Sequence, residues 1–399
     1  MSKTPVVGSA GEVLAAFLKL GLISFGGPIA HLGYFRAEFV ERRRWLSEQA
    51  FVDLIALAQF LPGPASSQTG FAIGLMRAGY AGGAAAWAGF TAPSAVLMTL
   101  FAWGAGSLAD TGWGVGLLHG LKLVAVAIVA QAVMGMARAL CPDRARASIA
   151  LVAIFVYLML AGSLGQIVGI LLGGAAGLLF CRGATAPDAT AMPIQVSRNA
   201  ALAFLALFFA LLALTFLPTG RTPLALFDAF YRSGALVFGG GHVVLPLLQQ
   251  ATVANGWISA SDFLAGYGAA QAVPGPLFTF ASYLGWIMSP APHHWVGMLC
   301  ATAGIFLPGL LLVIAVLPHW QVLRARRAVA ALLAGANAAV VGLLASAFYS
   351  PVWTSAVLSA TDFAVAVVAL LLLTRWRVRP LLVVLFCAAA GLAEALLHA

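Results

Sequence analysis

Three basic side chains lie well inside apolar stretches of this chain, where a charge is costly. They are Lys19, Lys122 and Arg232. Insertion scales put the cost of such a charge at about 2.5 to 3.5 kcal/mol at the centre of a membrane helix, so a cation at this depth is a functional candidate by default. Since cations attract anions, these three positions predict a site for a negatively charged ligand.

Lys19 and Arg232 precede matching Gly-Gly pairs, in FLKLGLISFGG at 17–27 and FYRSGALVFGG at 230–240. Two cations related by an internal repeat would face one another across the interface between the copies, which is where transporter sites lie. The structural alternative is that Lys19 extends to the lipid headgroups. Lys122 corresponds to Asn337, and for it an interhelical partner explains the charge as well as a substrate does.

Two Pro-Gly-Pro turns each follow a glutamine by three residues. Proline lacks an N–H and crowds the preceding turn, so each turn should break a helix. A helix that restarts near the bilayer midplane exposes unpaired N–H groups, which form an anion site. A simple kink is the structural alternative, but the duplication favours a site. The candidates are Gln59, Pro62, Gly63 and Pro64, and in the second half Gln271, Pro274, Gly275 and Pro276.

The Gly-Gly pairs should break helices in the same way, at Gly26, Gly27 and Pro28 and at Gly239, Gly240 and Gly241. Hydroxyl groups follow both Pro-Gly-Pro turns, and hydroxyl groups can donate hydrogen bonds to an oxyanion. They are Ser66, Ser67 and Thr69 in the first half, together with the amide of Gln68, and Thr279 and Ser282 in the second. These residues extend the predicted substrate site.

Asp53 and His31 are the candidates for proton coupling. Asp53 lies near the start of its segment and corresponds to Ala265, so an ordinary interfacial carboxylate is the alternative. His31 and His242 lie next to the glycine breaks without being equivalent, and local hydrogen bonding is the more ordinary explanation for both. The chain has no H-E-x-x-H, no G-x-S-x-G and no spaced cysteine pair. We therefore expect no enzyme, no metal site, no disulfide and no cofactor.

The segments that carry these residues belong to a membrane protein. The 399-residue chain is 62% hydrophobic and 8% charged, whereas soluble domains carry about 25% charged residues. Backbone groups in lipid must be satisfied internally, so we expect an all-α polytopic fold within the lipid bilayer. The net charge of +9 does not indicate nucleic acid, because the arginines lie in short loops between spans.

The chain contains an internal repeat. WLSEQAFVDLIALAQFLPGP at 45–64 matches WISASDFLAGYGAAQAVPGP at 257–276, and GFTAP at 89–93 matches GIFLP at 304–308. We assign the first copy to 1–181 and the second to 223–399. A connector at 182–222 contains an extra apolar span at 199–217.

Arginine placement distinguishes the two copies. Seven arginines lie in the loops at 36–44 and 138–146, and the matching loops of the second copy have none. The second copy reverses the pattern, with arginines at 324–327 and 375–379. Since basic loops stay cytoplasmic, the copies should be inverted relative to one another, with the amino terminus inside and the carboxyl terminus outside. This fits if 11–44 and 49–76 enter and return as broken hairpins.

The sequence FLKLGLISFGGPIAHLGYFR, the segment WLSEQAFVDLIALAQFLPGPASSQTGFAIG and their second-copy counterparts resemble the chromate ion transporter (CHR) family. The similarity is to its long-chain, two-domain branch and covers nearly the whole chain. It implies an inner-membrane carrier that exports chromate and gives chromate resistance. The second copy departs from the motif at Gly241, where the first has Pro28.

The residues alone reach an anion carrier but do not reach chromate. Sulfate, phosphate and molybdate are also tetrahedral oxyanions, and a carrier for one of them is an alternative. An anion channel is another, because selectivity filters also use broken helices. The sequence leaves open whether the protein forms a homodimer.

Overall fold

The computed structural model describes residues 8–160, 163–181, 196–217, 223–238, 241–289 and 294–397. The described residues form helices and turns, with no strand among them, which confirms the all-α prediction. The first copy contains α1 (Ala10–Ile23), α2 (Gly27–Phe35), the π-helical η1 (Arg36–Arg42), α3 (Glu48–Phe60), α4 (Ala65–Ala109), α5 (Gly112–Leu140), α6 (Arg144–Met159) and α7 (Ser163–Phe180).

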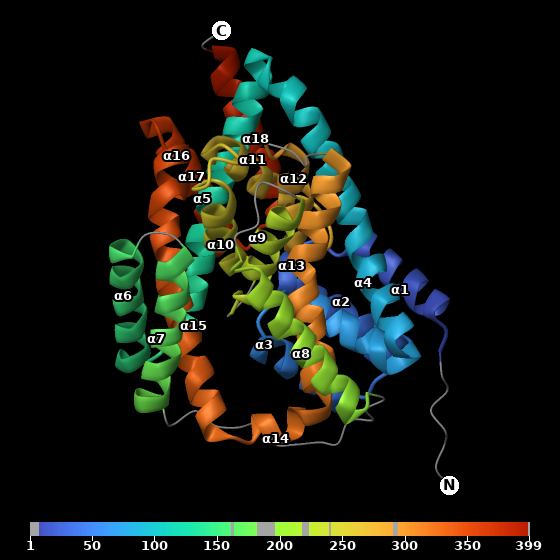
Figure 1. The fold of residues 1–399 in the computed structure, drawn as a ribbon. Helices are drawn as coiled ribbons and strands as arrows, with labels where there is room; N and C mark the ends of the chain where they lie inside the picture. The colour runs from blue at the N-terminus through green and yellow to red at the C-terminus, as the bar shows by residue number, and fades with distance from the viewer. Residues whose placement is uncertain are drawn as a thin grey trace.

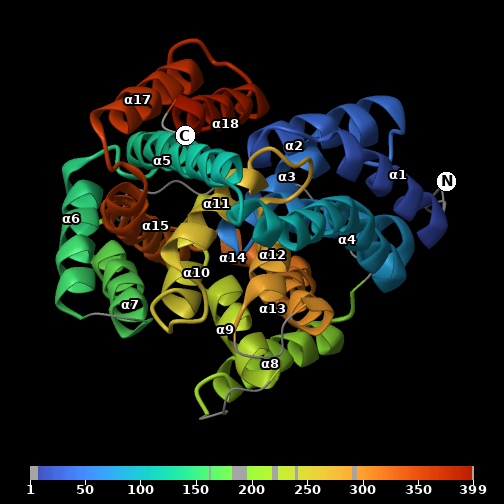
Figure 2. The same cartoon turned by 90° about the horizontal axis from the view of Figure 1, so that it is seen from above.

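The segment predicted as an extra span lies largely in α8 (Arg198–Leu214), an apolar helix shorter than the membrane-length segments, while the connector at 182–195 lies outside the described residues. The second copy contains α9 (Pro223–Ala235), η2 (Gly241–Val243), α10 (Val244–Thr252), α11 (Ala260–Ala270), η3 (Leu277–Thr279), α12 (Phe280–Ile287), α13 (His294–Val316), η4 (Leu317–His319), α14 (Trp320–Arg324), α15 (Arg327–Ala347), η5 (Phe348–Trp353), α16 (Thr354–Ala356), α17 (Ala360–Thr374) and α18 (Pro380–Leu397). Figures 1 and 2 show their arrangement.

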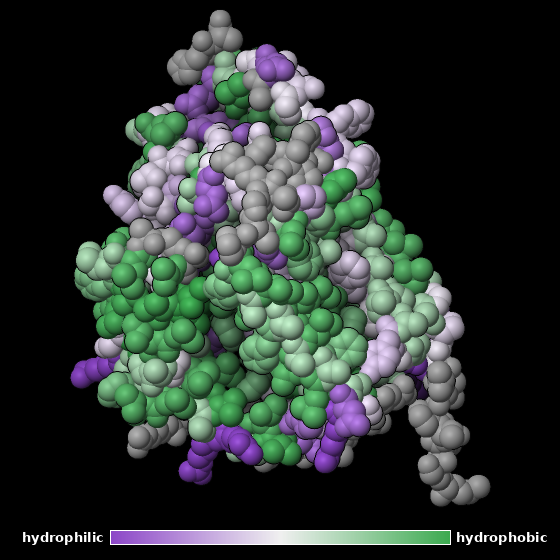
Figure 3. Space-filling view, viewed as in Figure 1, coloured by the Kyte–Doolittle hydropathy of each residue, from purple (hydrophilic) through white to green (hydrophobic). Residues whose placement is uncertain are grey.

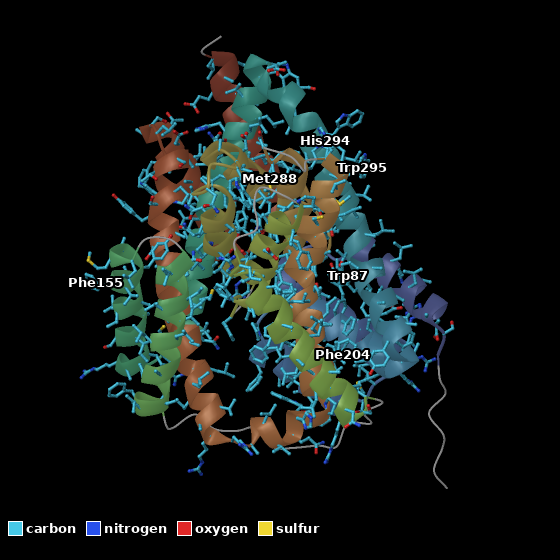
Figure 4. The ribbon with its side chains drawn as sticks, in the orientation of Figure 1. Trp87, Phe155, Phe204, Met288, His294 and Trp295 are labelled. Carbon is cyan, nitrogen blue, oxygen red and sulfur yellow. The ribbon has the colours of Figure 1, made fainter. Side chains whose placement is uncertain are left out.

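Among the described residues, 5 helical segments are long and apolar enough to cross a membrane: Ala65–Leu108, Gly112–Leu140, His294–Leu323, Arg327–Ala356 and Pro380–Leu397. Figure 3 shows hydrophobic residues gathered in a broad band, with hydrophilic ones concentrated above and below it. Phe155 projects outwards from α6 at the edge of the bundle (Figure 4) and is 64% exposed. Such a side chain is suited to lipid rather than water.

The helices of the predicted hairpins are too short to cross. The 13 residues of α3 extend about 20 Å, and the hydrocarbon core is about 30 Å thick. After the break that follows α3, the chain returns through the first part of α4 and reverses again at Ala78 and Gly79, whose φ and ψ angles are not helical. A β-carbon added to Gly74 would lie 2.3 Å from the carbonyl oxygen of Gly82, so the two parts of α4 lie back to back.

Equivalent helices of the two copies run in opposite directions. In Figure 1, α4 rises to the top of the molecule, where α5 begins, whereas α13 descends to α14 at the bottom. Likewise α5 descends and α15 rises. The two copies therefore form the inverted repeat that the arginine pattern predicts.

The last two helices of each copy pack against the other copy. Helices α6 and α7 pack on α15 of the second copy, and α17 and α18 pack on α5 of the first. Glycines permit both contacts. A β-carbon on Gly120 would lie 2.2 Å from the Cys387 carbonyl oxygen, and one on Gly335 would lie 2.1 Å from that of Gly173. On α7, Gly173 and Gly177 make the closest approaches to α15.

Replacing Gly120 by alanine tests this packing. We expect Gly120→Ala to lower stability by about 1 to 3 kcal/mol, because its methyl group meets backbone atoms that cannot move aside. Gly135, on the same helix, has nothing within 4 Å of an added β-carbon. Gly135→Ala should leave stability unchanged or raise it by up to about 1 kcal/mol through helix propensity. Thermal unfolding in detergent measures both, and equal effects would contradict the packing argument.

Candidate functional site

Four interruptions of helices meet where the two copies join, and we call them the four breaks. They lie at 24–26, 61–64, 236–238 and 271–276, and residues 239 and 240 are outside the described part of the chain. Gly63 and Gly275 have φ angles of +128° and +99°. Residues with a β-carbon rarely adopt such angles, so glycine is needed at the centre of each Pro-Gly-Pro turn.

Two main-chain hydrogen bonds connect the breaks in a reciprocal way. Gly63 N–H donates to the Val237 carbonyl at 2.7 Å, and Gly275 N–H donates to the Ser24 carbonyl at 2.9 Å. Gly63 and Gly275 are equivalent in the repeat, and so are Ser24 and Val237. Each Pro-Gly-Pro turn therefore binds the Gly-Gly break of the other copy.

A pseudo-two-fold axis passes through this junction. A β-carbon on Gly241 would lie 3.5 Å from the ring of Pro28, and these two residues occupy equivalent positions in the repeat. A residue meets its own equivalent only close to the axis that relates the copies. The departure of the second copy from the family motif at Gly241 thus lies at the centre of the molecule.

Each Pro-Gly-Pro turn also packs on the proline-containing helix of the other copy. A β-carbon on Gly63 would lie 3.2 Å from Cα of Gly309 on α13, and one on Gly275 would lie 2.8 Å from Oγ of Ser94 on α4. The Gln68 amide donates to the carbonyls of Pro62 at 2.8 Å and of Gly309 at 3.3 Å. Pro64, Pro274 and Pro276 are buried, and Pro62 is half-buried.

Several buried donors around the four breaks lack a hydrogen-bond partner among the described residues. They are the hydroxyls of Ser24, Ser67 and Thr91 and Nε2 of Gln271. Ser24, Ser67 and Thr91 are at most 3% exposed. Buried polar groups are nearly always hydrogen-bonded, so the donors left over beside the breaks are available to a polar ligand. Hydroxyl and amide hydrogens suit an oxyanion.

The two copies differ in how they use their hydroxyl groups. Thr279, the counterpart of Ser67, donates to the Pro276 carbonyl at 2.8 Å, and Ser282 pairs with Thr302 at 2.8 Å. The Ser67 hydroxyl lacks such a partner, and Ser66 lies 3.3 Å from Nδ1 of His31. The available donors are therefore more numerous in the first copy.

The restarting helices differ as well. In the first copy α2 begins directly after Gly26 and α4 after Pro64, and neither start has a side-chain cap. In the second copy the three-residue turns η2 and η3 take their place. The predicted exposure of helix N–H groups thus applies more fully to the first copy.

The predicted cations have separate partners. Lys19 Nζ lies 4.0 Å from Glu38, and its side chain is 54% exposed. Arg232 donates to the Thr215 carbonyl, and its guanidinium lies 5.0 Å from the centre of the Phe216 ring. These contacts do not bring the two cations together.

Lys19 belongs to a network of ion pairs that braces the first hairpin. Arg42 and Arg43 both bond to Glu38, and Glu12 pairs with Arg43 and Arg77. Burial alone would raise the pKa of Glu38, but the hydrogen bonds from the two arginines outweigh it and hold that pKa below its usual value. Glu38 is therefore the acceptor around which the loop at 36–44 is organised.

The remaining predicted residues lie in varied surroundings. Lys122 donates to Ser261 at 3.3 Å, so it has the interhelical partner considered for it. Asp53 is 3% exposed on α3, while Gln59 is exposed on the same helix. His31 is 1% exposed, and its ring packs edge-on against Phe90 at 5.2 Å.

Thr91 and Ser94 lie beside the four breaks but are not among the residues predicted from the sequence. A β-carbon on Gly275 would lie 3.2 Å from the carbonyl oxygen of Phe90, the neighbour of Thr91, and Ser94 donates to the Thr91 carbonyl at 3.0 Å. The available signal was the repeated match of GFTAP with GIFLP, which marks this segment without showing what it faces.

Comparison with known proteins identifies the family of this chain and matches each of its two copies separately. The family model described as "Chromate transporter" matches residues 11–178 and 224–392, one match for each copy. The chain belongs to the chromate transporter family. No solved structure matches it.

Two curated relatives cover most of the chain. The chromate transport protein of Pseudomonas aeruginosa is 28% identical over 344 residues, which are 84% of this chain and 79% of the relative. The probable chromate transport protein of Synechococcus elongatus is 27% identical over 348 residues, which are 85% of this chain and 84% of the relative.

The reciprocal bonds of the four breaks can be tested through their glycines. We expect Gly63→Ala and Gly275→Ala each to lower stability by about 1 to 3 kcal/mol, because a β-carbon is strained at these φ angles. Gly33→Ala on α2 is the control, since an added β-carbon has nothing within 4 Å there. Unfolding in detergent compares the three, and a wild-type melting temperature for both turn variants would refute the role of these glycines.

Proposed function

We propose that this protein is a secondary transporter that exports chromate across the inner membrane and so gives chromate resistance. The observation that carries the proposal is the set of buried, unpartnered donors beside the four breaks. Family membership and the names of the relatives support chromate as the substrate. In this proposal the amino terminus is cytoplasmic and the carboxyl terminus lies outside. The first described residues and the end of α18 lie towards opposite ends of Figure 1, which is consistent with that orientation.

The proposed site binds the dianion mainly through neutral donors. The hydroxyls of Ser24, Ser67 and Thr91 and the Gln271 amide would each donate to a chromate oxygen, and the N–H groups at the starts of α2 and α4 would add positive potential. Lys19, Arg232 and Lys122 would attract the dianion from a distance, an effect that salt weakens where these side chains are reached by water. Asp53 and His31 remain the proposed proton-coupling groups. The domain boundaries and a homodimer also stay predictions.

Removal of single donors tests the site. We expect Ser67→Ala and Thr91→Val each to weaken chromate binding about tenfold, because a hydrogen bond to a charged group contributes about 1.5 to 3 kcal/mol. Ser346→Ala is the control, since that hydroxyl donates to a carbonyl of its own helix, α15, at 3.0 Å.

The measurement is uptake of labelled chromate into inverted vesicles, with sulfate as competitor. Uptake no greater than in vesicles without the protein would reject chromate. Conductance in place of saturable flux would favour a channel.

Removal of the cations is a separate test. We expect Lys19→Ala and Arg232→Ala to reduce the apparent affinity for chromate, and more strongly at low ionic strength, because their effect would be electrostatic. Wild-type affinity in both variants would remove the cations from the site while leaving the neutral donors in place.

A further inference from the structure

A group of metal-binding side chains lies away from the four breaks, at the end of the bundle where α4 turns into α5. His119 lies on α5, Asp362 on α17 and Glu394 on α18, three helices that lie side by side in Figures 1 and 2. Nε2 of His119 is 2.6 Å from Oδ1 of Asp362. One ligand atom from each of the three residues lies within 4.8 Å of the others.

The surrounding backbone holds the group in position. Oδ2 of Asp362 accepts hydrogen bonds from the N–H groups of Leu358 and Ser359, both at 2.9 Å, so that Oδ1 is directed towards His119. Asp362 is 2% exposed. A β-carbon on Gly391 would lie 2.2 Å from the Gly116 carbonyl oxygen, so α18 is held close against α5. The ligand atoms therefore lie on packed helices rather than on loops.

The contact between these helices does not require His119 or Glu394, whereas Asp362 also caps the first turn of α17. Gly335 meets Gly173 and Gly177 in the same way as Gly120 meets Cys387 and Gly391. This correspondence pairs His119 with Ala334 and Glu394 with Phe180. The other copy thus makes the equivalent helix contact with apolar residues at these two positions, so His119 and Glu394 are additions to one copy.

We propose that His119, Asp362 and Glu394 bind a divalent transition-metal ion of the Zn²⁺ class. One imidazole and two carboxylates are typical ligands of such an ion. Ligand atoms about 2.1 Å from a tetrahedral ion lie about 3.4 Å from one another, which is more than the 2.6 Å between His119 and Asp362 and within the 4.8 Å that encloses all three ligand atoms. Binding requires Nε2 of His119 to be deprotonated, with the ring proton on Nδ1, and leaves a fourth position for water.

The ion would join the two copies. His119 belongs to the first copy and both carboxylates to the second, so coordination would tie α5 to the pair α17 and α18. Lys122 lies one turn from His119, and its ammonium group donates to Ser261 at 3.3 Å. Two carboxylates against this one cation leave the group net negative, as binding of a divalent cation requires.

Calorimetric titration of the full-length protein in detergent with Zn²⁺ tests the proposal. We expect one ion per chain for the wild type, and affinity at least about tenfold weaker for His119→Ala and for Glu394→Gln. Asp110→Asn is the control, because Asp110 is an exposed carboxylate at the turn between α4 and α5. That variant should bind like the wild type.

Melting temperature gives a second measurement that does not depend on transport. Saturating Zn²⁺ should raise the melting temperature of the wild type and leave that of Glu394→Gln unchanged, because a ligand stabilises the state that binds it. Glu394 is partly exposed near the end of α18, so this variant should fold. Absence of saturable binding by the wild type, or equal affinity in both ligand variants, would overturn the proposal. Neither result would bear on chromate transport.

Discussion

Two main-chain hydrogen bonds, from Gly63 to Val237 and from Gly275 to Ser24, hold together the part of the molecule on which everything else depends. A broken helix leaves N–H and carbonyl groups without partners, and in a membrane there is little water to replace them. This chain satisfies those groups by joining each break to a break of the other copy. The breaks can therefore lie deep in the protein, where polar side chains beside them are shielded from water.

The outer helices follow the same reciprocal plan. The pair α6 and α7 packs on the second copy, and the pair α17 and α18 packs on the first. Glycines at both contacts bring backbones together, which gives close van der Waals packing where no hydrophobic effect between helices operates. The two copies are therefore held together both at the four breaks and through the outer helices. Side-chain hydrogen bonding is less symmetric than the backbone. The Thr279 hydroxyl donates to the carbonyl of Pro276, whereas the Ser67 hydroxyl has no partner among the described residues.

The sequence predicted the features that depend on local residue type and on repetition. Proline and glycine at both turns identified the breaks, and arginine placement identified the inverted copies. It did not show the surroundings of the cations, because the partner of Lys19 is Glu38 on another segment and that of Arg232 is a backbone carbonyl. It also missed Thr91 and the group around Asp362. Residues from distant helices meet there through tertiary packing, which leaves no periodic signal in the sequence.

The reciprocal junction also constrains how such a chain could have arisen. Each Pro-Gly-Pro turn finds its acceptor on the other copy, so a polypeptide of half this length would carry a donor and an acceptor that it could not pair by itself. Such an ancestor would have to assemble as two identical subunits inserted in opposite directions. In that history the interface came before gene fusion, and the predicted extra span, which lies in α8, would be the single crossing that lets one chain keep both orientations.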